Sequence, residues 1–216
     1  MPIFLLSDDS SFPPPRFAER DGLLAVGGDL SQKRLLNAYA AGIFPWYSEG
    51  SPILWWSPDP RLVLLPDELK VSRSLRQCLR KGVFKITINE AFEEVIRACA
   101  DIRRKGQKGT WITKEMKDAY IQLHHAGYAH SVEAWDEEGL AGGLYGIILK
   151  KVFFGESMFA KKNNASKAAF VTFVEQLRLR DFVMIDCQMK TEHLISLGAR
   201  EISRAAYLKI LKKALS

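Results

Sequence analysis

Cysteine is scarce in this sequence, and its few thiols are poorly placed for disulfides or metal binding. Only three cysteines occur among 216 residues, at Cys78, Cys99 and Cys187, and none of them forms a C-x-x-C pair. An odd number of distant cysteines predicts neither a disulfide framework nor a zinc site. The adjacent residues His124 and His125 cannot share one helix face, which leaves no metal-ligand set. We therefore expect reduced, mostly buried thiols and no metal centre.

Long apolar runs are also missing. The apolar segment nearest the start, Ile3 to Leu6, has no basic residues before it and ends at Ser7 and Asp8. A run of this length is too short for a signal peptide or a membrane span. We therefore expect a soluble, cytoplasmic protein that does not enter a membrane.

The chain does contain enough apolar residues for a core, together with a modest excess of positive charge. Its hydrophobic content is 47%, which supports one domain, or one domain with a small companion. The net charge is +6, and a charge of this size on its own indicates only solubility. Its functional meaning depends on whether the positive residues cluster.

Two segments do concentrate positive charge. The first, Ser72 to Gly82, begins with a serine cap and ends at a glycine, so it is predicted to be a short helix. The second, Arg103 to Gly109, reads RRKGQKG and forms a loop after a predicted helix. Each segment alone is typical of a solvated surface, but two of them favour contacts with phosphate groups. The basic face of the predicted helix carries Arg73, Arg76, Arg80 and Lys81.

Residues 1–60 differ in composition from the rest of the chain, because they are rich in proline, glycine and aromatic residues. One clear helix is predicted there, from a cap at Ser31 to Gly42. We interpret residues 1–60 as a small irregular N-terminal subdomain and residues 61–216 as the main domain.

Regular elements are predicted from residue 61 onward. Strands are expected at residues 62–65, 84–88, 129–135, 140–149, 152–159 and 182–185, and the three consecutive strands at 129–159 should form an antiparallel meander. Helices are expected at residues 72–82, after a cap at Asn89, from a cap at Thr113 to Gly127, and at residues 165–180, 191–198 and 204–214.

A meander, a helix and a buried strand, in this order, make the core of the GNAT acyltransferase superfamily. The predicted fold class is therefore α/β (α+β), with a GNAT-like acyltransferase domain after the small subdomain. GNAT enzymes that use coenzyme A have a glycine-containing loop before the helix, where backbone N–H groups hold the pyrophosphate. The corresponding residues 160–169 read AKKNNASKAA and contain no glycine. This argues against a GNAT-type acyl-CoA N-acetyltransferase, which stays as the alternative function.

Two carboxylates occur in predicted core strands. Glu156 lies inside VFFGESMFA, and Asp186 follows the apolar run FVMI with Gln188 expected on its side of the strand. A buried carboxylate must be paired with a cation, hydrogen-bonded or open to a cleft. For Glu156 alone, a structural ion pair explains the sequence as well as a functional role does. The two acids together favour a polar cleft between splayed strands, with Cys187 pointing away as a core thiol.

The tryptophans offer flat surfaces for stacking. Trp55 and Trp56 are adjacent and point in different directions, so at least one of them should lie in the core. Trp46, beside a proline, and Trp111, just after the second basic segment, are better candidates to stack on an unpaired base. Core packing is the alternative role for both.

Longer motifs run in order along nearly the whole chain: GLLAVGGDLS (22–31), RLLNAYAAGIFPWYSEGSPILWWSPDPR (34–61), GTWIT, GESMF, NASKAA and IDCQ. This series closely resembles the leucyl/phenylalanyl-tRNA–protein transferase family. The resemblance implies transfer of leucine or phenylalanine, and less well of methionine, from aminoacyl-tRNA to proteins that begin with Arg or Lys. The product is marked for the bacterial N-end rule degradation route. No cofactor is implied, because the donor is an ester on tRNA rather than a coenzyme A thioester.

The resemblance also implies roles for individual residues. Asp186 and Gln188 would form the catalytic group, and Glu156 would orient the reacting amine. An apolar pocket would receive the donor side chain, aromatic rings would hold the terminal adenosine of the tRNA, and a basic patch would bind the tRNA. The implied pocket residues are Leu144, where the family often has methionine, Met158, Phe173 and Ile185. The implied tRNA contacts are Trp46 and Trp111 for the adenosine and Arg80 and Lys81 for the patch, with Arg76 on the same predicted helix face.

Attack on an activated ester requires a neutral amine, and an α-amino group has a pKa of about 8. We hypothesise that Asp186 draws the proton from this amine, through or beside Gln188. A noncatalytic tRNA-binding protein is a second alternative, which would explain the basic and aromatic residues but leave Glu156 and Asp186 without a purpose. Turnover in a peptide-transfer assay separates the two.

Overall fold

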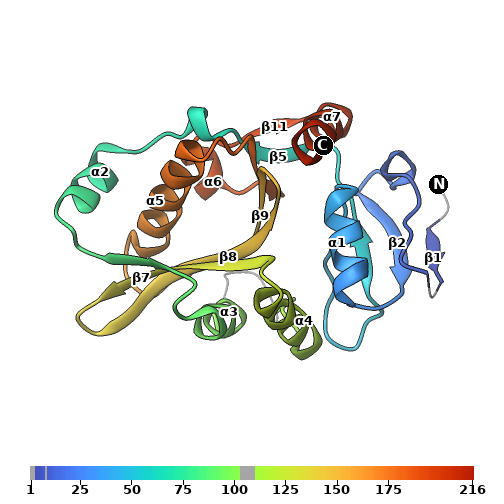
Figure 1. The fold of residues 1–216 in the computed structure, drawn as a ribbon, viewed down its shortest axis with the longest axis horizontal. Helices are drawn as coiled ribbons and strands as arrows, with labels where there is room; N and C mark the ends of the chain where they lie inside the picture. Colours follow the sequence, from blue (N-terminus) through green and yellow to red (C-terminus); the bar gives the residue numbers. More distant parts are fainter. Residues whose placement is uncertain (1–2, 8, 103–109) are drawn as a thin grey trace.

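The computed structural model describes residues 3–7, 9–102 and 110–216, which form two β-sheets flanked by helices (Figure 1). Within these residues, the smaller sheet has the strand order β1-β2-β4-β3 and the larger sheet the order β11-β5-β10-β9-β8-β7-β6. A mixed α/β fold is therefore confirmed. The predicted basic loop Arg103–Gly109 lies outside the described residues.

The smaller sheet is built by the first 60 residues, with strands β1 (Phe4–Leu6), β2 (Leu23–Gly27), β3 (Phe44–Pro45) and β4 (Leu54–Trp56). Helix α1 (Gln32–Ala40) begins as predicted, where the Ser31 hydroxyl accepts a hydrogen bond from the backbone N–H of Arg34. The expectation that this region is irregular is wrong, because it contains a regular four-stranded sheet. Its strands are two to five residues long, too short to show alternation between the prolines and glycines around them.

The larger sheet consists of β5 (Arg61–Leu64), β6 (Lys85–Ile88), β7 (Ala129–Asp136), β8 (Gly139–Leu149), β9 (Val152–Ala160), β10 (Met184–Gln188) and β11 (Arg200–Ile202). Strands β7, β8 and β9 pair antiparallel, so the predicted meander is confirmed. Helix α5 (Ala165–Leu179) then returns the chain, and β10 lies parallel to β9. The three-residue edge strand β11 was not predicted.

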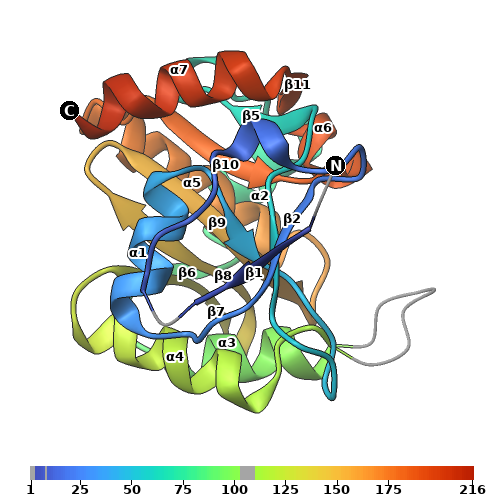
Figure 2. The same ribbon diagram turned by 90° about the vertical axis from the view of Figure 1, so that its right-hand side faces the viewer.

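Helices cover both faces of the larger sheet (Figure 1). Helices α2 (Arg73–Arg80) and α5 belong to the core on one face, and α3 (Phe92–Asp101) and α4 (Lys114–His125) to the core on the other. The chain closes with α6 (Glu192–Ser196) and α7 (Arg204–Leu215), and α7 lies above α1 (Figure 2). No helix in the described ranges has the length and apolar character that a membrane crossing requires.

Helix α3 is not capped by Asn89, contrary to the sequence prediction. Asn89 has a left-handed backbone, with φ of 62°, and its side chain accepts a hydrogen bond from the backbone N–H of Ser131 on β7. The buried carboxylate of Glu133 instead accepts the N–H of Ala91 at the start of the helix, at 3.4 Å. A negative group from a neighbouring strand thus satisfies a free N–H at the helix N-terminus, and it leaves no local signal in the sequence.

Strands β9 and β10 stay together over only part of their length. Their parallel pairing ends where Phe154 lies opposite Asp186. Beyond that point β9 continues beside β8, as far as Ala160, while Gln188 of β10 pairs with Leu62 of β5. The two strands therefore diverge, and the space between them is lined by their side chains rather than bridged by backbone hydrogen bonds.

Candidate active site

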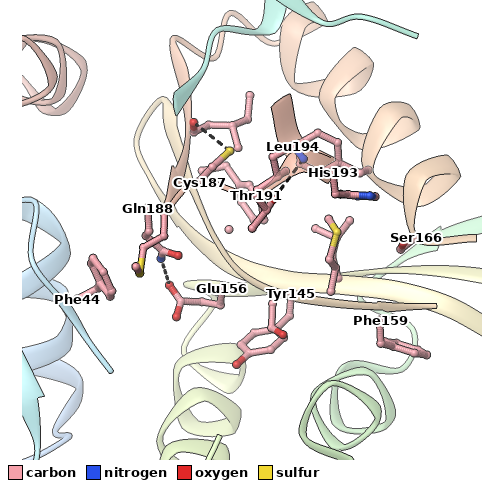
Figure 3. Close-up of a pocket in the computed structure, with 18 of the residues that line it drawn as sticks. Phe44, Tyr145, Glu156, Phe159, Ser166, Cys187, Gln188, Thr191, His193 and Leu194 are labelled. Carbon is pink, nitrogen blue, oxygen red and sulfur yellow. Dashed lines mark hydrogen bonds between the residues drawn. The ribbon is translucent and has the colours of Figure 1, made fainter. Parts of the chain in front are cut away.

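A cavity of about 650 Å³ opens where β9 and β10 diverge. Its walls come from both strands, from α6, from the beginning of α5 and from β3 of the smaller sheet. Figure 3 shows Glu156 and Gln188 pointing toward one another on one side, with His193 and Ser166 on the other. The predicted cleft between splayed strands is therefore present, although its polar groups are not all the expected ones.

Glu156 has no cationic hydrogen-bond partner among the described residues. Its oxygens accept hydrogen bonds from Tyr39 Oη at 2.8 Å, Tyr120 Oη at 3.0 Å and Gln188 Nε2 at 2.9 Å, and the two tyrosine hydroxyls also contact each other. The structural ion pair considered for Glu156 is thus absent from the described contacts. Three neutral donors hold a carboxylate that faces the cavity.

The surroundings of Glu156 keep it close to half-protonated near neutral pH. Burial raises the pKa of Glu156 to about 7, although the hydrogen bonds from the two tyrosines and Gln188 oppose that rise. Burial, and next the charge of Glu156, raise the pKa of Tyr39 and of Tyr120 well above the usual value. Both phenols therefore stay protonated as donors. Glu156 can exchange a proton with a ligand at physiological pH.

Asp186 does not open into the cavity, contrary to the sequence hypothesis. It is fully buried and forms a two-pronged ion pair with Arg61, whose Nε and Nη2 lie 2.8 and 2.7 Å from Oδ1 and Oδ2. Tyr207 Oη also donates to Oδ2, at 2.7 Å. Burial, the largest single cause, would lower the pKa of Arg61, but the charges and hydrogen bonds of Asp186 and Tyr207 together outweigh it and raise the pKa, so the guanidinium stays charged. Asp186 therefore forms a structural ion pair in the core instead of opening to the cavity.

A β-bulge separates Gln188 from Asp186. The residues opposite them on β5 are Leu62 and Val63, so two steps along β10 match one step along its neighbour. Gln188 also has a left-handed backbone, with φ of 59°. Strict alternation therefore fails at this point, and the side chain of Gln188 turns to Glu156 while Asp186 stays in the core.

Most of the predicted donor pocket is found in the cavity wall. Leu144, Met158 and Ile185 line it, beside Glu156. Phe173 does not line it but packs edge-on against Phe153, with ring centroids 4.9 Å apart. Apolar residues that sequence reasoning missed also line the cavity, namely Phe153, Phe159, Phe170 and Leu194.

Cys187 belongs to the buried core, as predicted, but it also contributes to the cavity wall. Its Sγ lies 3.8 Å from the carbonyl oxygen of Ile185. Burial, and next the charge of Asp186, raise the pKa of this thiol. A thiol in that state is a poor nucleophile, which agrees with the interpretation as a core residue.

The two tryptophans chosen from the sequence both line the cavity. Trp46 and Trp111 are half-buried, and Trp46 packs edge-on against Trp56 at 5.8 Å. Trp55 is fully buried, which confirms that one of the adjacent pair lies in the core.

The basic residues of α2 lie apart from these rings. Arg76, Arg80 and Lys81 are exposed and do not line the cavity. They extend the helix surface that was predicted to be basic, and each side chain is accessible to a polyanion.

Several residues at the site carried no signal in the sequence. Tyr39 was predicted only to be part of a helix, and Arg61 only to precede the strand expected at residues 62–65. Tyr120 and Tyr207 had no assigned role. Their partners are 21 to 125 residues away in the chain, so no local spacing could have revealed them.

Comparisons with known proteins agree with the geometry. The family models "Leucyl/phenylalanyl-tRNA protein transferase N-terminal domain" and "Leucyl/phenylalanyl-tRNA protein transferase" match residues 28–59 and 63–212. The chain is 60% identical over 215 residues to the leucyl/phenylalanyl-tRNA–protein transferase of Anaeromyxobacter sp. (strain K), covering 100% of this chain and 92% of that relative. It is 60% identical to the protein of that name from Syntrophobacter fumaroxidans, covering 98% and 90% of the two chains.

Solved structures give a weaker likeness. L-PGS from Bacillus licheniformis matches with a TM-score of 0.42 and 12% identity, covering 80% of this chain and 57% of that chain. A likeness of this degree supports no argument about fold or function.

Proposed function

The chain belongs to the leucyl/phenylalanyl-tRNA protein transferase family, and we propose that its donors are leucyl- and phenylalanyl-tRNA, with methionyl-tRNA used less well, and its acceptors proteins that begin with Arg or Lys. Membership makes the chain an aminoacyltransferase that takes an amino acid from tRNA and joins it to a protein. The new peptide bond would create an N-terminal degradation signal, and the reaction would take place in the cytoplasm, where charged tRNA is found.

The observation that carries this proposal is an apolar cavity with a proton-accepting group at its side. Leu144, Met158 and Ile185 supply a wall suited to an aromatic side chain or to an aliphatic one that is not branched at Cβ, and Glu156 faces the same space. Such a wall disfavours polar side chains because they would lose their hydration. One methylene changes binding by only about 1–3 kcal/mol, so weaker use of methionine is expected.

Glu156 is the carboxylate that we assign to proton transfer. The acceptor nitrogen attacks the ester carbonyl carbon, the bond from that carbon to the ribose oxygen breaks, and the amine proton passes to Glu156 and then to the ribose oxygen. A base with a pKa of about 7 is well matched to an amine with a pKa of about 8. Gln188, hydrogen-bonded to Glu156, would orient the amine. Asp186, which the sequence hypothesis named as the base, contributes to the reaction only by holding Gln188 in place.

The tRNA would be held at two places. Trp46 and Trp111 line the cavity and offer ring faces to the terminal adenine, since bases stack on aromatic side chains. Arg76, Arg80 and Lys81 would contact phosphates farther along the acceptor stem. The positive side chain of the acceptor residue would lie near Glu156, whose charge favours Arg or Lys.

We further propose that the molecule has two domains, at residues 1–60 and 61–216, each built around one of its sheets. The order of meander, α5 and β10 in the second domain supports a GNAT-like assignment. The absence of glycine from residues 160–169 fits a donor that carries no pyrophosphate at the start of α5.

A transfer assay tests the proposal directly. Radiolabelled leucine, phenylalanine, methionine and valine, each on its tRNA, are offered with peptides that begin with Arg, Lys or Asp. We expect transfer from the first three to the Arg and Lys peptides only. Equal transfer to the Asp peptide would overturn the acceptor assignment. Acetylation of the Arg peptide by acetyl-CoA, without transfer from tRNA, would overturn the whole proposal.

The role of Glu156 is tested by Glu156→Gln, with Glu133→Gln as a matched control. Glu133 is also a buried carboxylate held by neutral donors, but it lies outside the cavity wall. We expect kcat to fall about 100-fold or more for Glu156→Gln, as is typical when a general base is lost, and to stay near wild type for the control. Equal loss in both variants would mean that the effect is structural.

A further inference from the structure

Asp186 is the centre of a buried hydrogen-bond network that the reaction itself does not use. Its Oδ1 accepts from Arg61 Nε at 2.8 Å and from the backbone N–H of Gln188 at 2.9 Å. Its Oδ2 accepts from Arg61 Nη2 and from Tyr207 Oη, both at 2.7 Å. A carboxylate offers about four acceptor positions. All of them are occupied by protein donors in a fully buried position, so no position is left for the amine of a substrate.

The network ends on a strained part of the site. Gln188 adopts φ of 59°, a left-handed conformation that is uncommon for residues other than glycine. Such a conformation persists only when its surroundings determine it from several sides. Here the backbone N–H of Gln188 is held by Asp186, and its side-chain amide is held by Glu156. The position of Asp186 therefore decides where this amide points.

Asp186 is in turn held by two residues that lie behind it. The Cζ atom of Arg61 is 4.7 Å from the centre of the Phe44 ring and 4.7 Å from that of Tyr207. Phe44 comes from the smaller sheet and lines the cavity, whereas Tyr207 comes from α7. The stack fixes the plane of the guanidinium, and with it the two parallel hydrogen bonds to Asp186.

The stack also has an energetic cost. Nη1 of Arg61 is buried and has no hydrogen-bond partner among the residues that the structure describes. A buried donor without a partner destabilises a fold, and its presence in a structure calls for a functional explanation.

We propose that Arg61 and Tyr207 are positioning residues for aminoacyl transfer. Acting through Asp186, they hold Gln188 in its left-handed conformation and so aim its amide at the reacting amine beside Glu156. This inference rests on the proposed function, because it needs Gln188 and Glu156 at the reacting centre. It assigns Asp186 to geometry rather than to proton transfer.

The main test is Tyr207→Phe, which removes one hydrogen bond to Asp186 and keeps the ring stacked on Arg61. Arg61→Lys is the second variant, because lysine keeps the charge but cannot form two parallel hydrogen bonds to a carboxylate. The control is Leu211→Ala, since Leu211 is buried on the same helix but has an apolar side chain that forms no hydrogen bond. For each variant, kcat, both KM values, the pH profile of kcat and the Tm are measured with leucyl-tRNA and an Arg peptide.

We expect kcat to fall about 10-fold for Tyr207→Phe and about 100-fold for Arg61→Lys, because a displacement of about 1 Å in a positioned group can cost about 100-fold in rate. Both KM values and the midpoint of the acid limb should stay as in the wild type. Leu211→Ala should lower the Tm with little change in kcat. If Arg61→Lys fails to fold, Tyr207→Phe alone decides.

Three results would overturn the inference. An unchanged kcat in Tyr207→Phe would make the network merely structural. If kcat falls equally in Tyr207→Phe and Leu211→Ala, and both variants lose the same Tm, the network is again merely structural. An acid limb shifted to higher pH in Tyr207→Phe would show that Asp186 itself takes the proton, because the lost donor raises the pKa of its partner. If the wild type transfers no amino acid, the proposed function fails first, and this inference fails with it.

Discussion

The raised pKa of Glu156 makes a prediction about stability that is separate from activity. Moving this pKa from 4.5 in the unfolded chain to about 7 in the folded protein corresponds to about 3 kcal/mol. The folded state holds the proton more tightly, so the contribution of Glu156 is most favourable below pH 4.5. It is lost progressively as the pH rises to about 7, because folding must then bury an ionised carboxylate.

Glu156→Gln removes this dependence, since glutamine does not titrate. The free energy of unfolding of the variant, relative to wild type, should therefore rise by about 3 kcal/mol between pH 4.5 and pH 8. Urea denaturation of both proteins at several pH values measures the difference. Other titrating groups, such as His130 and His193, are common to both proteins and cancel. The variant is thus expected to be the more stable protein above pH 7 while it has lost most of its activity.

A difference that stays constant with pH would refute the reasoning. It would show that Glu156 ionises in the folded protein as easily as in the unfolded chain, so that the hydrogen bonds from Tyr39 and Tyr120 offset the whole effect of burial. Glu156 could then not be assigned as the general base, because an ordinary carboxylate is a weak proton acceptor at neutral pH.

Three further changes test other parts of the site. Trp111→Ala should raise the KM for leucyl-tRNA by a factor equivalent to about 1–3 kcal/mol of binding free energy and leave the KM for the peptide unchanged; equal effects on both KM values would mean that Trp111 only packs in the core. Asp186→Asn should lower the free energy of unfolding by about 3–5 kcal/mol, since Arg61 would stay buried without its partner, and a urea titration showing less than 1 kcal/mol would contradict this. Leu144→Ala should raise the ratio of phenylalanine to leucine transfer by a factor equivalent to about 1 kcal/mol, and an unchanged ratio would show that Leu144 does not contact the donor side chain.

Local features of the fold could be predicted because their causes are local. The hydroxyls of Ser31, Ser72 and Thr113 cap three helices as expected, each by accepting an N–H three residues later. The meander followed from three apolar runs separated by short polar turns. The failures arose where the partner was distant, as at Asn89, whose expected cap is replaced by Glu133 from another strand.

The candidate site was predicted only in part, because local motifs can be read from the sequence and pairing between distant segments cannot. Motif spacing located Glu156, Gln188, Trp46 and Trp111, and all four line one cavity. Alternation along a strand was used to place Asp186 beside them, but alternation assumes regular pairing. The bulge at Gln188 breaks that assumption, and it depends on how β10 pairs with β5.

The sequence by itself determined the family, the order of most helices and strands after residue 61 and several of the residues around the cavity, because periodicity, caps and motifs act over a few neighbouring positions. Only the tertiary structure decided which of the two acids, Glu156 or Asp186, faces the cavity. Arg61 meets Asp186 across 125 residues, and Tyr39 meets Glu156 across 117 residues. These contacts exist because strands and helices from both parts of the chain pack together, and packing between distant segments sets burial, charge pairing and pKa.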